Sequence, residues 1–174
     1  GDGCQVGPHV ILKGPTVIGK RNQIFQFATV GEDSPALAYA GEKTTLSMGD
    51  DNVIREGVTI HRGLVQGTGS TVIGNNNLFM AYAHIGHDCD VADHVIMANN
   101  ASLAGHVLVG DYSNMGGYSG ILQFRHVGAY SHISAFSFVL KDVPAYVTVA
   151  GNPALAVGMN MEGMRRRGLP KDVM

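Results

Sequence analysis

The sequence has few cysteines, few charges and no tryptophan. It has two cysteines and six prolines, and 15% of its 174 residues are charged, with a formal net charge of −2. Cys4 and Cys89 form no CxxC pair, so we expect free thiols rather than a disulfide framework or a zinc knuckle. The low charge argues against a nucleic-acid partner. The one basic cluster, Arg165-Arg166-Arg167, indicates either a solvated turn or an anion site for a phosphate or diphosphate.

Long hydrophobic runs are also missing. None approaches the roughly 18 residues that a membrane helix needs. The first residues, GDGCQVG, lack the basic and apolar regions of a signal peptide. We therefore expect one cytoplasmic domain without membrane insertion. Glycine is abundant instead, with 24 residues, which favours many tight turns within one body.

Apolar residues recur every six positions through most of the chain. The unbroken run is Ile73, Phe79, Ile85, Val91, Met97, Leu103, Val109, Met115, Ile121, Val127, Ile133 and Val139. Four residues after each of these comes a mostly small residue, with Arg125 as the exception. The same phase is found upstream at Val6, Leu12, Ile18, Ile24, Val30, Met48, Ile54 and Ile60. This period suits short strands joined by turns around a coil, with one large and one small residue pointing inward.

The repeat predicts an all-β fold, a parallel β-helix of triangular coils. Three hexads would close a coil of about 18 residues, and successive coils would stack at the usual strand spacing of roughly 4.8 Å. The phase is interrupted at about residues 31–47 and 61–72, where Gly, Ser, Glu and Thr predict two inserted loops. We assign residues 1–158 to the β-helix and residues 159–174 to a C-terminal extension.

One coil carries a concentrated group of polar residues, in the stretch AYAHIGHDCD. With Ile85 pointing inward, Cys89 becomes the small inward residue and behaves as a buried hydrophobe. His84, His87 and Asp88 fall on outward or turn positions, where they would face solvent or a neighbouring subunit. They are therefore candidates for function rather than parts of the core.

Spacing alone leaves catalysis, a polar subunit interface and a metal site open. One coil of 18 residues places Gly105 roughly 5 Å from His87, where its N–H could serve a substrate oxygen beside the imidazole. Asp88 could orient the ring of His87 and stabilise its imidazolium form. Zinc is disfavoured, because two turn histidines on one coil would need a third ligand from another chain. We assign no metal ligand.

Several stretches together resemble the family of UDP-N-acetylglucosamine O-acyltransferases that begin lipid A synthesis. They are IGKRNQIFQFATVGE, DNVIREGVTIHRG, AYAHIGHDCDV, LAGHV, KDVPAYV and NMEGMRRRG. The resemblance implies a homotrimer of left-handed parallel β-helices, an exception to the usual crossover hand, with active sites between subunits. It also implies transfer of a 3-hydroxyacyl group from acyl carrier protein to the 3-hydroxyl of UDP-N-acetylglucosamine, with no cofactor.

The resemblance assigns roles to individual residues by motif match. His87 would be the general base, Asp88 its partner and the amide of Gly105 the donor to the oxyanion. Further residues of the cleft would be His84, His106 and Gln123. The residues that match the nucleotide and sugar side are Asn160, Glu162, Arg166 and Arg167. Ala135 matches a position whose size limits acyl length, and its bulky neighbours Phe136 and Phe138 favour a medium chain.

The sequence also departs from the family's pattern. Ala36 and Ala38, in SPALAYAGE, replace an acidic residue and a lysine, and Leu122, in ILQF, replaces a histidine. The first coils of the family and its C-terminal helical region, which helps to form the trimer and to receive acyl carrier protein, are not part of this sequence. Our leading interpretation is the acyltransferase with an altered substrate-binding periphery. The alternative is a weak or inactive trimeric β-helix that acts as a ligand-binding module or scaffold.

Overall fold

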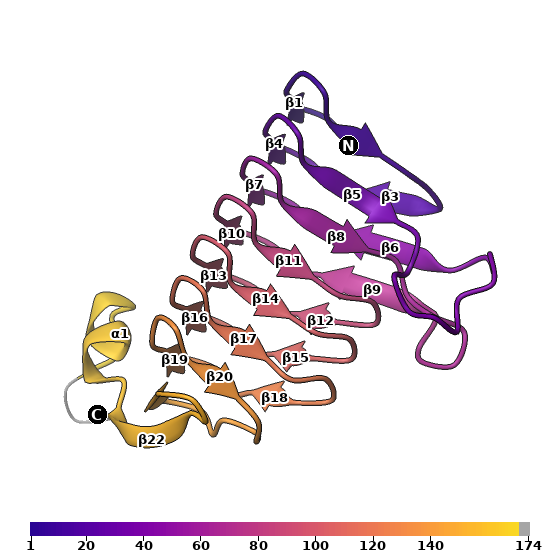
Figure 1. The fold of residues 1–174 in the computed structure, drawn as a ribbon. Coiled ribbons are helices and arrows are strands. Elements are labelled where there is room, and N and C mark those ends of the chain that lie inside the picture. The colour runs from indigo at the N-terminus through magenta and orange to yellow at the C-terminus, as the bar shows by residue number, and fades with distance from the viewer. Residues whose placement is uncertain (171–174) are drawn as a thin grey trace.

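The computed structural model describes residues 1–170, which form a stack of short parallel strands joined by tight turns (Figure 1). Each coil gives one strand to each of three sheets, so the coils are triangular. The strand pairs repeat at a constant interval, since Leu78 pairs with Ile96 and Ile96 pairs with Asn114. This register confirms the predicted coil of 18 residues.

The strands of the three sheets follow one another in chain order around the coil. Sheet A contains β1 (Gln5–Val6), β4 (Gln23–Ile24), β7 (Val53–Ile54), β10 (Leu78–Phe79), β13 (Ile96–Met97), β16 (Asn114–Met115), β19 (His132–Ile133), β21 (Val147–Ala150) and β22 (Leu155–Met159). Sheet B contains β2 (Ile11–Leu12), β5 (Thr29–Glu32), β8 (Thr59–His61), β11 (His84–Ile85), β14 (Ser102–Leu103), β17 (Gly120–Ile121) and β20 (Phe138–Val139). Sheet C contains β3 (Thr16–Ile18), β6 (Thr45–Met48), β9 (Ser70–Ile73), β12 (Asp90–Val91), β15 (Leu108–Val109) and β18 (His126–Val127).

The interior of the stack is filled by the residues that the repeat places there. Every apolar position of the run from Ile73 to Val139 is buried, and none is more than 3% exposed. The small residues between them are buried as well, except Arg125, which is partly exposed near Asp142. The buried side chains from Ile24 to Val149 pack against those of neighbouring coils and form one hydrophobic core.

The first coil does not bury its inward residues. Val6 and Leu12 continue the phase, but they are 51% and 48% exposed. Because β1 and β2 are the first strands of their sheets, these side chains pack against a coil on one side only. The six-residue phase therefore predicts correctly that these side chains point inward, whereas their full burial also requires a neighbouring coil on each side.

Two loops leave the stack within the ranges expected for insertions. The first loop, residues 33–44, connects β5 to β6, and the second, residues 62–69, connects β8 to β9. Both are shorter than expected, because strand pairing extends into the predicted loop ranges. We call residues 62–69 the cap loop.

A ladder of buried asparagines joins the coils from which the loops emerge, but at a different corner, between sheets C and A. Asn22, Asn52 and Asn77 are at most 1% exposed. Oδ1 of Asn22 accepts a hydrogen bond from the N–H of Asn52 at 2.8 Å, and Oδ1 of Asn52 accepts one from the N–H of Asn77 at 3.0 Å. The side-chain amides of Asn22 and Asn52 donate to the carbonyls of Gly49 and Gly74. The side chains of Asn22 and Asn52, whose donors and acceptors are both paired, favour one alignment of the coils.

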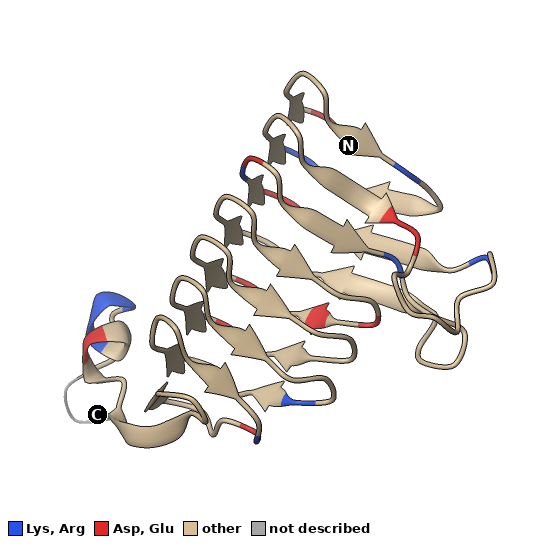
Figure 2. Ribbon diagram, in the orientation of Figure 1, with Lys and Arg blue, Asp and Glu red and all other residues tan. Residues whose placement is uncertain are grey.

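The parallel stack ends earlier than the expected boundary at residue 158. The chain reverses after Gly151, whose φ of 101° suits glycine, and β22 then runs antiparallel to β21. The helix α1 (Met161–Arg166) follows, and basic residues gather on it (Figure 2). Nowhere in residues 1–170 is there a helix with the length and hydrophobicity to span a membrane.

Candidate active site

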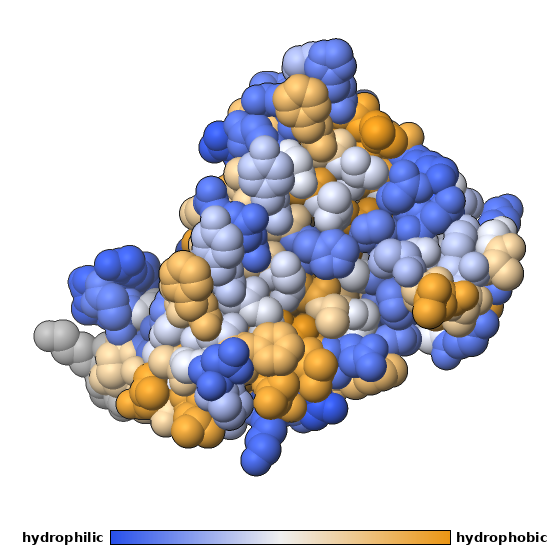
Figure 3. Space-filling view, viewed as in Figure 1, coloured by the Kyte–Doolittle hydropathy of each residue, from blue (hydrophilic) through white to orange (hydrophobic). Residues whose placement is uncertain are grey.

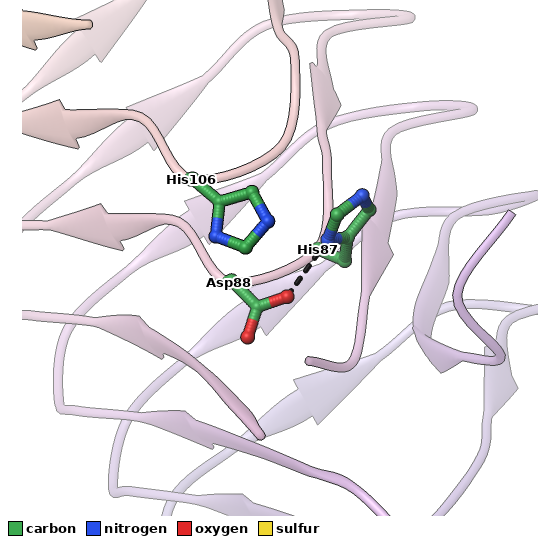
Figure 4. Close-up of side chains that lie close together, drawn as sticks. All are labelled: His87, Asp88 and His106. Atoms are coloured by element: carbon green, nitrogen blue, oxygen red, sulfur yellow. Dashed lines mark hydrogen bonds and ion pairs between the residues drawn. The ribbon is translucent and has the colours of Figure 1, made fainter. Parts of the chain in front are cut away.

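His87 and Asp88 lie in the turn between β11 and β12, at the corner where sheet B meets sheet C. Nδ1 of His87 is 2.7 Å from Oδ2 of Asp88 (Figure 4). Because a carboxylate only accepts hydrogen bonds, Nδ1 carries the proton, and the lone pair of the neutral imidazole lies on Nε2. Nε2 is therefore the atom of His87 that can accept a proton from a substrate.

Gly105 occupies the corresponding turn one coil later and lies directly against the imidazole. A Cβ at this position would be 2.6 Å from both Cε1 and Nε2 of His87, so a larger residue would displace the ring. No group in residues 1–170 accepts a hydrogen bond from the N–H of Gly105, which leaves this donor available to a ligand. The predicted proximity of Gly105 and His87 is confirmed.

The turn position of Asp88 predicted an exposed side chain, and this prediction is wrong. The side chain is buried beneath the cap loop. Its side chain is 0% exposed, whereas that of His87 is 13% exposed. Oδ1 accepts hydrogen bonds from the N–H groups of Thr68 and Gly69 and from the Thr68 hydroxyl. Oδ2 accepts from the N–H of Leu64 as well as from His87. The backbone of the cap loop thus replaces the water that would otherwise solvate the carboxylate.

These hydrogen bonds keep Asp88 ionised. Burial by itself raises the pKa of this carboxyl, but the hydrogen bonds from His87, Thr68 and Leu64 outweigh it and hold the pKa below its usual 3.8. Gly67 allows the close approach of the loop, because a Cβ there would be 2.6 Å from Oδ1 of Asp88. A carboxylate with a negative charge therefore lies next to Nδ1 of His87 at neutral pH.

His84 and His106 flank this pair as neutral imidazoles. The ring of His106 meets that of His87 edge-on, with 5.0 Å between the centroids, and stacks on Phe124 at 4.4 Å. Nδ1 of His84 is 2.8 Å from Oγ1 of Thr59. Burial lowers the pKa of both imidazoles, that of His84 to about 4. Both side chains can therefore hydrogen-bond a substrate without adding positive charge at pH 7.

The distances alone would allow a metal ion at this corner. One possible ligand atom from each of His87, Asp88 and His106 lies within 4.8 Å of the others. However, five hydrogen bonds occupy the two oxygens of Asp88, and Nδ1 of His87 is one of the donors. A cation would have to displace these donors, so the arrangement suits proton transfer better than metal binding.

The structure brings together only part of the predicted site. Gln123 lies at the same corner as His87, one coil beyond Gly105. Ala135 is exposed in the turn between β19 and β20, at a different corner. A separate cavity of about 780 Å³, between α1 and the outer face of sheet A, is lined by the other four, Asn160, Glu162, Arg166 and Arg167. Within one chain, His87 and these arginines therefore lie on different faces.

The departures from the family pattern lie at the surface. Ala36 and Ala38 belong to the first loop, and Leu37 between them is fully exposed. Leu122 lies beside Leu140 on the next coil, and with Phe138 these side chains form an exposed hydrophobic area over β20 (Figure 3). The loop tip and the cleft thus lack the charges and the imidazole of the family pattern.

Replacing Thr68 with valine is expected to destabilise the protein by about 1–2 kcal/mol at pH 7, because the charged Asp88 loses one donor. The pKa of Asp88 is depressed in the folded state, so this contribution exists above its unfolded pKa and disappears as pH falls through the folded one. Denaturant unfolding at pH 7 and at a pH below the folded pKa of Asp88, which is itself below 3.8, measures the difference. Thr68→Ser keeps the hydroxyl and serves as control. An equal loss at both pH values would mean that the hydroxyl acts only through its other partner, the carbonyl of Ser70.

No sequence pattern pointed to Thr68, Leu64 or Gly69 as partners of Asp88. They belong to the cap loop, where the six-residue repeat does not apply. The only available signal was the glycine content of the loop, which allows a close backbone approach but does not say to what.

Comparisons with known proteins identify the family that the chain resembles. Residues 142–174 match the family described as Udp N-acetylglucosamine O-acyltransferase, Domain 2, and residues 70–105 match the bacterial transferase hexapeptide family. The acyl-[acyl-carrier-protein]–UDP-N-acetylglucosamine O-acyltransferase of Saccharophagus degradans is 64% identical over 99% of this chain and 67% of its own length. That of Stutzerimonas stutzeri is 56% identical over 93% of this chain and 63% of its own length.

A solved structure has the same fold as this chain. LpxA, a UDP-N-acetylglucosamine acyltransferase from Bacteroides fragilis, matches with a TM-score of 0.96 at 33% identity, over 99% of this chain and 67% of that one. The predicted left-handed parallel β-helix is confirmed. This chain spans about two thirds of the length of the relatives that it matches. It belongs to the UDP-N-acetylglucosamine O-acyltransferase family.

Proposed function

We propose that the chain forms the β-helix of an enzyme that transfers a 3-hydroxyacyl group from acyl carrier protein to the 3-hydroxyl of UDP-N-acetylglucosamine, the first step of lipid A synthesis. The observation that carries the proposal is the position of His87, with Asp88 bound to Nδ1 and Gly105 against Nε2. The substrates follow from the names of the relatives.

The reaction begins with proton transfer to His87. Nε2 removes the proton of the sugar hydroxyl while the hydroxyl oxygen attacks the carbonyl carbon of the thioester. The imidazolium that forms is stabilised by the ionised carboxylate of Asp88. General base catalysis of this kind contributes roughly 10² to 10⁴ in rate.

The tetrahedral intermediate is stabilised by the N–H of Gly105. The carbonyl oxygen becomes an oxyanion, and a free backbone donor beside Nε2 is suited to bind it. When the intermediate collapses, the C–S bond breaks, and the leaving thiolate of acyl carrier protein takes the proton from His87. The products are the acylated sugar nucleotide and free acyl carrier protein, with His87 returned to its neutral form.

The complete site is formed by two chains of a cytoplasmic homotrimer. His87 lies at the corner of sheets B and C, whereas the cavity with Arg166 and Arg167 lies against sheet A. A ligand that contacts both groups needs the second from a neighbouring subunit. The guanidinium groups suit the diphosphate of the nucleotide, because they bind phosphate with charge-assisted hydrogen bonds.

A transfer assay tests the proposal directly. Protein incubated with UDP-N-acetylglucosamine and a series of 3-hydroxyacyl carrier proteins is expected to form the 3-O-acylated nucleotide, with a medium chain preferred. Mass spectrometry identifies the product and its chain length. A correctly assembled trimer that forms no product with any donor would favour a binding module or scaffold, a function with which the uncharged loop tip at Ala36 and Ala38 is compatible.

A further inference from the structure

The polar residues that line the cavity beside α1 differ in the hydrogen bonds and ion pairs that they form within the chain. Oδ1 of Asn160 accepts a hydrogen bond from the N–H of Gly163 at 3.1 Å, as the N-cap of α1. Nδ2 of Asn160 donates to the carbonyl of Tyr130 at 2.8 Å, and its N–H donates to the carbonyl of Tyr146 at 2.7 Å. Asn160 therefore fixes the start of α1 to the β-helix, and little of its hydrogen-bonding capacity remains for a ligand.

Glu162 is occupied by two of the three arginines. It accepts hydrogen bonds from Arg165 at 2.8 and 2.9 Å and from Nε of Arg166 at 2.7 Å. These bonds, first those from Arg165, lower the pKa of Glu162 to about 2. Arg167, in contrast, forms no ion pair with any carboxylate in residues 1–170. Among residues 1–170, Arg167 is thus the arginine lining the cavity that pairs with no carboxylate.

Arg167 lies on an aromatic ring. Its Cζ is 5.3 Å from the centroid of Tyr112. Tyr112 is itself stacked between His94, at 4.5 Å, and Tyr130, at 4.8 Å, and Tyr130 stacks on Tyr146 at 5.4 Å. We call these four residues the aromatic column; it follows the corner between sheets C and A over successive coils.

We infer that the aromatic column holds α1 in place and that Tyr112 is a positioning residue for Arg167 in the binding of the nucleotide diphosphate. The column contacts both ends of α1, through the carbonyls of Tyr130 and Tyr146 at Asn160 and through the ring of Tyr112 at Arg167. This inference rests on the proposed function, since it concerns the anion that the proposed substrate carries.

The physical reason is pre-organisation of a flexible side chain. A guanidinium that lies over an aromatic ring is attracted to the ring's π-electrons, while the N–H groups at its edge remain free for two parallel bonds to phosphate. Arg167 is exposed, so without the ring it would lose rotamer freedom when it binds the ligand. The stacked neighbours keep Tyr112 from turning away, so the support is rigid.

Calorimetric titration with UDP-N-acetylglucosamine tests the inference without depending on turnover. Tyr112→Leu is expected to weaken binding about three- to tenfold, as the loss of a cation–π contact predicts. Tyr112→Phe keeps the ring and should bind like the wild type. In the Arg167→Ala background, Tyr112→Leu should cause no further loss. In the transfer assay, KM for the nucleotide should rise by the same factor with kcat unchanged.

Controls separate this role from a general structural one. Tyr118 stacks on Phe136 at 5.2 Å at another corner, and Tyr118→Leu should leave the affinity unchanged. Should Tyr112→Leu fail to fold, Tyr112→Met makes the same test, because its unbranched side chain occupies a similar space without an aromatic ring. This variant is expected to bind three- to tenfold more weakly, as the loss of the cation–π contact predicts. Unchanged affinity of a folded Tyr112→Met protein would overturn the inference.

The outcomes also distinguish this inference from the proposed function. Affinity that depends on Arg167 but not on Tyr112 overturns the inference alone, and so does an equal effect of Tyr112→Leu with and without Arg167. Coupled effects of Tyr112 and Arg167 on nucleotide binding, with no transfer from any donor, support the inference and overturn the proposed function. Wild-type protein without affinity for the nucleotide overturns both.

Discussion

Replacing His87 with alanine is expected to abolish acyl transfer and to leave a folded trimer. The variant loses the imidazole whose Nε2 lies against Gly105, so the rate should fall by roughly 10² to 10⁴. Asp88 loses one donor but keeps those of the cap loop, so the cost in stability should be about 1–3 kcal/mol. Product formation, measured together with the mass of the assembly and its thermal unfolding, separates the two effects.

A matched histidine outside the site provides the control. His126 lies in β18 of sheet C, and its side chain is exposed. His126→Ala should therefore retain the wild-type rate. Undiminished turnover of His87→Ala would reject His87 as the base, whatever the outcome for the control.

The same variant can also show whether two chains share one site. His87→Ala and Arg167→Ala proteins should each be inactive or weak. When they are unfolded together and reassembled, some interfaces will combine an intact His87 with an intact Arg167, and a fraction of the activity should return. No recovery in mixed trimers would mean that both residues act within one subunit, contrary to their separation in the fold.

Replacing Val109 with aspartate is expected to unfold the β-helix or to destabilise it by more than about 4 kcal/mol. Val109 is 3% exposed and pairs with Val91 and Val127 on the adjacent coils. A carboxylate at this position would be buried without a partner, and removal of the valine would also lose its packing. Urea unfolding, with assembly followed by size, measures the loss. Ile121→Asp, on sheet B, should behave alike, because Ile121 is 2% exposed.

The adjacent residue supplies a sharp control for the register. Leu108 precedes Val109 in β15, points outward and is 38% exposed. Leu108→Asp should change the free energy of unfolding by no more than about 0.5 kcal/mol. If Leu108→Asp were severely destabilising and Val109→Asp tolerated, the assignment of inward positions would be shifted by one residue.

The β-helix could be predicted from the sequence because each coil places the same hexad position in the same surroundings. From Ile73 to Val139 the period predicted which side chains point inward, how long each coil is and which residues are buried. The ends were not predictable in this way. Val6 is exposed because burial depends on a second neighbouring coil, and the reversal into β22 depends on the turn after Gly151 rather than on a hydrophobic pattern.

The candidate site was predictable where its residues belong to the repeat and not where they belong to the loops. His87 and Gly105 belong to the uninterrupted repeat, so one coil of chain length was enough to bring them together. The burial of Asp88 was missed because its partners come from the cap loop, for which no period exists. Motif matches also grouped Arg166 and Arg167 as equivalent, whereas only the positions of Glu162 and Tyr112 distinguish them.

The asparagine ladder lies at a different corner of the coils from the cap loop. Asn22, Asn52 and Asn77 carry the alignment of the coils past the points where both loops emerge. The cap loop can therefore gain or lose residues, and change how tightly it covers Asp88, while the spacing of the coils stays fixed. A change in the length of this one loop would thus alter the surroundings of His87 and Asp88 without moving the coils that carry them.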